Sequence, residues 1–291
     1  MPVLPLALIA LAQSCDPATL RATLDSLAGQ VPGKVGIAIR PAGGRETIGI
    51  HLDERFPMQS VYKLPIVMTV LDEADRGKLS LERPIRIRHG DIAPVHSPIR
   101  EQYPDGNVNF SIRQLARAAI VESDGTASDV LLDVVSTGKV RSYLRRLEID
   151  SMVVATSEKE MAKDLRAQYR NWSTPRAAVA LLEALDHDDA LAKTSRSLLL
   201  GWLTETTIGP DRLRGGLPAG TKVAHKTGTD RTVDGITRAT NDVGLVTLPD
   251  GTKLAIAVFV ADSPADLTTR EGAIAAVAKV AWRCQVGKPK S

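Results

Sequence analysis

The hydrophobic pattern of this 291-residue chain changes twice, and that order constrains the fold more than any other feature. Near the two ends, apolar residues alternate or run continuously, as they do in strands, whereas from about 60 to 203 they recur at helical spacing. Strands from both ends can share one sheet if the chain returns to it after the helical segment. We therefore predict an α+β fold, in which an antiparallel sheet is flanked by terminal helices and an all-α lobe is inserted between its strands.

The pattern also predicts the individual elements. A start signal, Asp16-Pro17, precedes a first helix at 17–28, and a Pro-Ala-Gly-Gly turn joins two strands into a hairpin. The strands are expected at 35–39, 47–51, 222–226, 242–248 and 254–261, and the later helices at 64–71, 112–120, 130–135, 140–147, 177–185 and 265–284. Accordingly, the predicted α/β lobe comprises 15–58 and 204–291, and the all-α lobe comprises 59–203.

The first fourteen residues form a segment of their own. An apolar run is followed by Ala12-Gln13-Ser14, a small-x-small pattern that a signal peptidase could cut before Cys15. The run is about ten residues long, and a membrane-spanning helix needs about 20. We interpret 1–14 as a signal peptide, with a buried N-terminal segment as the alternative, and expect a periplasmic or secreted protein with no membrane span.

Composition excludes several classes of function. Hydrophobic residues make up 43% and charged residues 24%, which is typical of a globular protein. Aromatic residues are only 3%, and 37 Lys and Arg against 34 Asp and Glu leave no basic block, so we expect no nucleic-acid partner. The two cysteines are far apart and the five histidines show no paired spacing, so neither a metal nor another cofactor is expected.

A serine and a lysine stand three residues apart where a helix is expected to begin. Ser60 and Lys63 would share one face of its first turn. A serine hydroxyl needs a neighbour that takes its proton, and a desolvated lysine can serve, while the helix N-terminus favours a developing oxyanion. Because Ser-x-x-Lys arises by chance in most proteins, this motif alone does not establish a nucleophile.

Two further motifs follow in the chain. Ser123-Asp124-Gly125 precedes a helical run, and Lys226-Thr227-Gly228-Thr229 lies on a predicted strand. In this order, Ser-x-x-Lys, Ser-Asp-x and Lys-Thr-Gly form the three-part signature of penicillin-recognising serine enzymes. The boundary between the two lobes is where such motifs would meet, because ligand sites are common in clefts of that kind.

Longer blocks carry a more specific resemblance. They are Gln59–Leu64, Thr206–Leu213, Leu217–Thr221, Ala224–Thr229 and Ala239–Asp242. With them the sequence resembles the class A serine β-lactamases over nearly the whole chain, and is most similar to their extended-spectrum cephalosporinase branch. The resemblance implies the β-lactamase/transpeptidase-like fold, hydrolysis of a small-molecule β-lactam, and a monomer. In that fold the first and last helices pack side by side, so the resemblance implies that Cys15 and Cys284 could meet, and it leaves open whether they are bonded.

The resemblance also assigns roles to individual residues. Ser60 would be acylated, Lys63 would help to remove its proton, and Ser123 would pass a proton to the departing ring nitrogen. The substrate carboxylate would be held by Lys226, Thr227, Thr229 and Arg212, around Gly228. The backbone N–H groups of Ser60 and Thr229 would form the oxyanion hole. A lysine with hydroxyl donors and a nearby arginine suits a carboxylate ligand.

Release of the acyl group requires a general base that holds a water molecule. In the loop between the second and third motifs, we choose Glu158 as this base and regard Glu160 as the alternative. Three residues depart from the family pattern: Gly125 and Ala162 replace asparagines, and Asn171 replaces an acidic anchor of the loop. Two alternatives stay open. One is a D,D-peptidase, a class that shares the three motifs but lacks the loop glutamate. The other is a sensor that is acylated by penicillin and does not release it, and Gly125 and Ala162 keep this alternative open.

Overall fold

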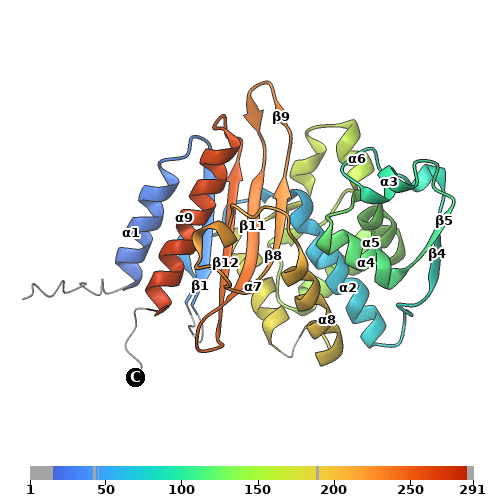
Figure 1. The fold of residues 1–291 in the computed structure, drawn as a ribbon, viewed down its shortest axis with the longest axis horizontal. Coiled ribbons are helices and arrows are strands. Elements are labelled where there is room, and N and C mark those ends of the chain that lie inside the picture. The colour runs from blue at the N-terminus through green and yellow to red at the C-terminus, as the bar shows by residue number, and fades with distance from the viewer. Residues whose placement is uncertain (1–15, 42–43, 45, 188–189, 287–291) are drawn as a thin grey trace, which may run out of the picture.

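The computed structural model describes residues 16–41, 44, 46–187 and 190–286. The predicted leader 1–14 and Cys15 therefore lie outside the described residues. Figure 1 shows a sheet with the first and last helices on one side of the molecule and a mostly helical lobe on the other. This arrangement agrees with the predicted α+β fold, in which terminal helices flank a sheet.

One five-stranded antiparallel sheet combines strands from both ends of the chain, in the order β2-β1-β12-β11-β8. The strands are β1 (Lys34–Arg40), β2 (Ile48–Ile50), β8 (Val223–Thr229), β11 (Thr240–Thr247) and β12 (Lys253–Ala261). β12 is central, and its apolar run fits a strand that is covered on both faces. Its pairing with β1 confirms that the two ends of the chain share one sheet.

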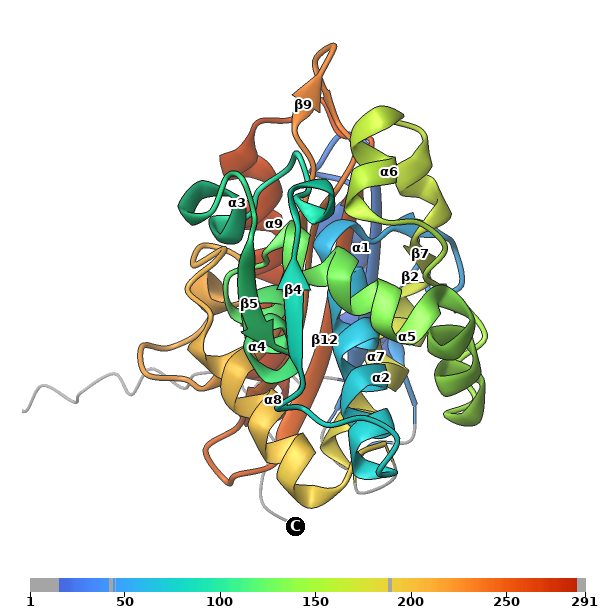
Figure 2. The same cartoon turned by 90° about the vertical axis from the view of Figure 1, so that its right-hand side faces the viewer.

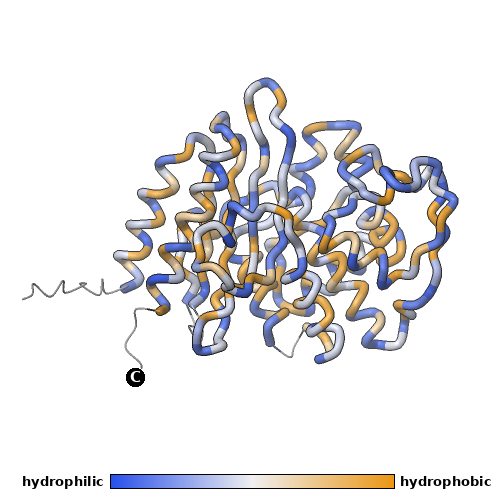
Figure 3. Tube along the Cα trace, viewed as in Figure 1, coloured by the Kyte–Doolittle hydropathy of each residue, from blue (hydrophilic) through white to orange (hydrophobic). Residues whose placement is uncertain are grey.

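Helices cover both faces of the sheet. α1 (Pro17–Ala28) and α9 (Leu267–Val286) lie side by side on one face, and α7 (Pro175–Asp186) packs on the other. Along α1 and α9, hydrophobic and hydrophilic residues are interspersed, as expected of helices that bury one side (Figure 3). α1 begins where Asp16 accepts hydrogen bonds from two backbone N–H groups. Cys284 of α9 is buried and disulfide-bonded.

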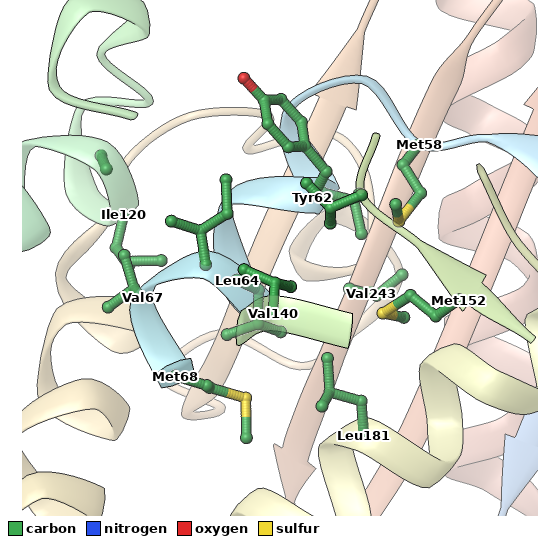
Figure 4. Packing of buried hydrophobic residues seen from close by; sticks show 14 of the residues in the cluster. Met58, Tyr62, Leu64, Val67, Met68, Ile120, Val140, Met152, Leu181 and Val243 are labelled. Carbon is green, nitrogen blue, oxygen red and sulfur yellow. The ribbon is translucent and has the colours of Figure 1, made fainter. Parts of the chain in front are cut away.

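The inserted lobe is built around α2 (Lys63–Asp75), which is buried from Lys63 to Glu73. Its other helices are α3 (Pro98–Gln102), α4 (Ile112–Val121), α5 (Gly125–Arg146), α6 (Glu158–Lys163) and α8 (Lys193–Glu205). Figure 4 shows Leu64 and Met68 of α2 among buried side chains that include Val243 of the sheet and Leu181 of α7. One hydrophobic core therefore continues from the lobe to the sheet.

Two features of the lobe differ from the sequence analysis. The sequence predicts separate helices at 130–135 and 140–147, whereas the structure joins both segments in α5, where Ser136 (φ 62°, ψ 153°) marks a kink between two helical stretches. Short strands also occur, and Figure 2 shows β4 and β5 lying side by side across the lobe. The small strands are β3 (Phe56–Pro57), β4 (Pro84–Ile87), β5 (Val108–Ser111), β6 (Met152–Val153), β7 (Trp172–Ser173), β9 (Thr232–Val233) and β10 (Ile236–Thr237).

Candidate active site

A cavity of about 400 Å³ lies where the sheet meets the helical lobe. Each of the three sequence motifs, as well as the loop that carries Glu158, contributes a side chain to its lining. These residues are Ser60, Lys63, Ser123, Glu158 and Thr229. The structure thus brings together, in one cavity, residues that are far apart in the sequence.

Ser60 lies in a turn of 3₁₀-helix, η1 (Gln59–Tyr62), and α2 continues from Lys63. The sequence predicts one helix here, and the structure divides it into a tighter turn followed by an α-helix. Gln59 has φ 45°, a left-handed conformation that is uncommon for a residue other than glycine. Asn241 of β11 fixes the preceding backbone, because its Nδ2 donates to the carbonyls of Pro57 (2.9 Å) and Met58 (3.1 Å).

Gly228 brings strand β8 into contact with this turn. A Cβ atom built on Gly228 would lie 2.3 Å from the carbonyl oxygen of Met58, a distance that a backbone atom cannot tolerate without moving. Glycine therefore allows the close approach that places Thr229 and Ser60 in the same cavity. The two backbone N–H groups expected to form the oxyanion hole thus belong to adjoining elements.

Two buried lysines converge on Ser123. The Lys63 Nζ donates to the Ser123 carbonyl at 2.6 Å, and the Lys226 Nζ donates to the Ser123 hydroxyl at 2.9 Å. Each lysine is only 1% exposed. Burial lowers the pKa of Lys226 well below its usual range, and the nearby positive charge of Lys63 lowers that pKa further. Ser123 therefore lies between two buried lysine amino groups, one at its carbonyl and one at its hydroxyl.

Glu158 forms a buried ion pair beside Ser60. Its Oε1 lies 3.0 Å from the Lys63 Nζ, and the two side chains are 8% and 2% exposed. Such a pair is a weak source of stability, because removing both charges from water offsets their attraction. Glu160, the alternative base, is exposed and pairs with Lys163. The structure brings Glu158 to the cavity and leaves Glu160 on the surface.

Asp129 holds the start of α6, and sequence analysis missed it. One carboxylate oxygen accepts from the Glu158 N–H at 2.7 Å and the other accepts from the Lys159 N–H at 3.0 Å. Burial raises the pKa of Asp129 to about 6. The start of a helix attracts carboxylates, and this is the only signal for the contact in the sequence. That signal does not indicate which acidic residue, distant in the chain, makes the contact.

Two amide side chains, those of Asn171 and Gln168, hold the segment that contains α6 in place by hydrogen bonds. Asn171 accepts from the N–H groups of Ala155 (2.8 Å) and Thr156 (3.0 Å), and donates to the Thr156 carbonyl. Gln168 accepts from Gln59, next to the serine, and donates to Asp230 after β8. Although Asn171 is not acidic, it ties the two ends of this loop together.

Arg212 lies behind Thr229. It is 3% exposed, and its Nη2 donates to the Thr229 hydroxyl at 2.8 Å, while its Nε pairs with Glu271 at 3.0 Å. Its Nη1 donates to the carbonyls of Gly228 and Asn241. Arg212 is therefore linked to the cavity through Thr229, and its positive charge stands behind the Lys-Thr-Gly strand.

Gly125 has no room for a side chain. A Cβ atom at this position would lie 2.4 Å from Cγ2 of Val95 and 3.1 Å from the His96 carbonyl oxygen. Val95 and His96 both line the cavity. Val95 fills the space next to Gly125. In the family that the sequence resembles, an asparagine side chain occupies this position.

We expect Gly125→Ala to lower the free energy of unfolding by about 1–3 kcal/mol, because the added methyl overpacks against Val95. Val95→Ala removes the clashing atom. The double variant should therefore lose less free energy of unfolding than the two single variants lose together. Urea unfolding of all four proteins gives the coupling energy. Strictly additive effects would show that Val95 is not what excludes a side chain at this position.

Metal and membrane features were searched over the described parts of the chain. In these parts, no group of three or more His, Cys, Asp or Glu residues is arranged to hold a metal ion. Within the same ranges, no helix has the length and apolar character needed to cross a bilayer.

Comparison with known proteins identifies the family. The model of the β-lactamase enzyme family matches residues 19–285. The extended-spectrum β-lactamase PER-1 of Pseudomonas aeruginosa is 36% identical over 92% of this chain and 88% of its own length. The β-lactamase VEB-1 of the same organism is 39% identical over 88% of this chain and 86% of its own length.

Solved structures agree with the sequence comparison. A β-lactamase from Chitinophaga pinensis is 42% identical, with a TM-score of 0.87, and the match covers 91% of this chain and 98% of that one. The TLA-1 extended-spectrum β-lactamase is 38% identical, with a TM-score of 0.88 and the same coverage. With the three motifs in one cavity and the family model matching residues 19–285 of its 291, the chain belongs to the class A serine β-lactamases.

Proposed function

We propose that the chain hydrolyses β-lactam antibiotics through an acyl-enzyme on Ser60, which water activated by Glu158 then cleaves. The observation that carries this proposal is the Lys63–Glu158 ion pair, which is buried in the cavity that Ser60 lines. An ion pair in that place can accept and return protons near both the serine and an incoming water. Several relatives named as extended-spectrum β-lactamases support the same reaction.

In the acylation step, the Ser60 Oγ attacks the carbonyl carbon of the β-lactam ring. Lys63 takes part in removing the hydroxyl proton, and the Ser60 and Thr229 N–H groups stabilise the developing oxyanion. The carbon–nitrogen bond of the ring then breaks. Ser123, which accepts a hydrogen bond from Lys226, delivers a proton to the departing nitrogen.

In the deacylation step, Glu158 takes a proton from a water molecule that attacks the ester carbonyl. The bond to the Ser60 Oγ breaks, the serine recovers its proton, and the opened product leaves. The hydrogen bonds from Glu158 and Lys159 to Asp129 hold the start of α6, and thus the base, in place.

A β-lactam of the penicillin or cephalosporin type carries one carboxylate, and the cationic side of the cavity fits it. Thr229 lines the cavity there, with Lys226 and Arg212 behind it and Thr227 and Gly228 in the same strand. We assign these residues to carboxylate binding. We also propose that the protein acts as a monomer in the periplasm or outside the cell.

One experiment tests this reaction against its two alternatives. Purified protein is incubated with a chromogenic cephalosporin and then weighed by mass spectrometry. We expect many turnovers per protein molecule and no lasting adduct. A single burst that leaves a stable adduct would instead indicate a sensor, and release of D-alanine from a cell-wall peptide would indicate a D,D-peptidase.

A further inference from the structure

A buried side chain of the sheet holds the backbone that leads to Ser60. Asn241 is 0% exposed, and its Nδ2 donates to two carbonyls, that of Pro57 at 2.9 Å and that of Met58 at 3.1 Å. An amide NH2 group carries two hydrogens, so each carbonyl can receive one. The opposite orientation of the amide would place its oxygen against two carbonyl oxygens. These contacts therefore settle that the donor end of Asn241 faces the turn.

The acceptor end of the same amide is not matched in this way. No described residue donates a hydrogen bond to the Asn241 Oδ1, although this atom is buried. An unpaired buried acceptor destabilises a fold, and an apolar side chain of the same size would avoid that penalty. Packing stability therefore does not explain an asparagine at this position. A requirement for two donors that face the turn does explain it.

Asn241 and Gly228 meet this turn at the same point of the sheet. The two residues are paired in the β8–β11 register, and a Cβ atom on Gly228 would lie 2.3 Å from the Met58 carbonyl oxygen and 3.3 Å from the Gln59 Cβ. The Met58 N–H donates to the Asn171 carbonyl at 2.9 Å. Both backbone groups of Met58 are thus held, one by β11 and the other by the segment that follows α6.

The residue between this held backbone and the nucleophile has an unfavourable conformation. Gln59 has φ 45°, which residues other than glycine adopt only where their surroundings enforce it. The peptide before Gln59 contains the carbonyl that Asn241 holds, and the peptide after it carries the Ser60 N–H. The dihedral angles of Gln59 join these two planar units. If the Met58 carbonyl were free to turn, Gln59 would relax and the Ser60 N–H would change direction.

We infer that Asn241 is a positioning residue for the nucleophile. Its two amide hydrogens hold the backbone before Gln59, so that the Ser60 N–H points to the place where an oxyanion forms. Because Asn241 is fully buried, it acts through the Met58 carbonyl and touches no substrate atom. The consequence for β-lactam turnover rests on the proposed function, whereas the direction of the Ser60 N–H does not.

Asn241→Leu tests this inference, since leucine has about the same size and no donor. The probe is phenylboronic acid. The Ser60 Oγ bonds to its boron and the serine proton passes to the base of the site, so that a tetrahedral, negatively charged boronate forms. We expect its Kd, measured by calorimetry, to rise about 10²-fold, the lower end of the effect of losing one oxyanion donor. The kcat/KM for a chromogenic cephalosporin should fall by the same factor, because boronate and transition state need the same N–H.

The loss should lie in the reaction and not in substrate binding. On a Ser60→Ala background, Asn241→Leu should leave the Kd for the intact cephalosporin little changed, whereas a general disturbance of the cavity would raise it. Asn241→Asp is the second variant, because it keeps the shape of the side chain while an ionised carboxylate offers no hydrogen to the two carbonyls. It should lose at least as much boronic acid affinity, and it tests the inference even if the leucine variant does not fold.

Tyr143→Phe is the matched control. Tyr143 is 1% exposed and its hydroxyl donates to the Ala190 carbonyl at 3.3 Å, so this variant also removes a buried hydrogen bond to the backbone. It should bind the boronic acid as the wild type does. Wild-type affinity in a folded Asn241 variant would overturn the inference, and so would equal losses in Asn241→Leu and Tyr143→Phe. If the wild type bound the boronic acid without hydrolysing the cephalosporin, the proposed function would fail, while weaker binding by the Asn241 variants would still uphold the inference.

Discussion

Glu158→Gln should turn the protein into a trap for its substrate, since the acyl group still forms on Ser60 but water is no longer activated. General-base catalysis contributes about 10²–10⁴-fold, so we expect kcat to fall by about that factor. The covalent adduct should persist long enough for mass spectrometry to detect it. The substitution keeps the shape of a side chain that is 8% exposed, so the fold should be retained.

Glu160→Gln is the control for this prediction. Glu160 is the same residue type, two positions along the same helix, but it is exposed and paired with Lys163. Turnover by this variant should match that of the wild type. If Glu160→Gln trapped the adduct and Glu158→Gln did not, the assignment of the base would have to be reversed.

Ser60→Ala should remove covalent chemistry altogether. Loss of the nucleophile in serine hydrolases costs about 10⁶-fold in kcat, and we expect a loss of that order here. No adduct should appear in the mass spectrum even at high cephalosporin concentration. Ser60 is partly exposed and lines the cavity, and alanine removes only its hydroxyl group, so the fold should be retained.

The exposed Ser142 of α5, whose hydroxyl donates to the Gly138 carbonyl, provides a matched serine-to-alanine control. Ser142→Ala should retain full turnover. An adduct that still formed on the Ser60→Ala protein would identify a different nucleophile, and Ser123 in the same cavity would be the first to examine.

The parts of the structure that follow from local pattern were predictable. The helix at 17–28 begins and ends where its start signal and apolar spacing place it, and the continuous apolar run of β12 marks a central strand. The three motifs could be assigned to one cleft because each has a recognisable spacing. In such cases the signal comes from residues that are close in the sequence, so it can be interpreted without knowledge of the fold.

Other parts could not be predicted, because they depend on contacts between distant segments. The β4 and β5 strands are four residues each and partly exposed, so they are too short for an alternating pattern to appear. Asp129 accepts a hydrogen bond from the Glu158 N–H, 29 residues along the chain, and no pattern near Asp129 or Glu158 predicts that contact. His225 and Asp242 look like ordinary strand residues until the register of β8 and β11 places them together.

The pairing of β1 with β12 has a consequence for folding during translation. During synthesis, the strand at 34–40 emerges long before its partner at 253–261, so β2 is the only one of its two sheet neighbours that exists for most of that time. Contacts of such long sequence separation close slowly, because the chain between them must first lose much of its freedom. Asn241, which donates hydrogen bonds to the carbonyls of Pro57 and Met58, is likewise synthesised only near the end of translation. The turn that carries Ser60 is thus synthesised well before the strand that fixes the backbone leading into it.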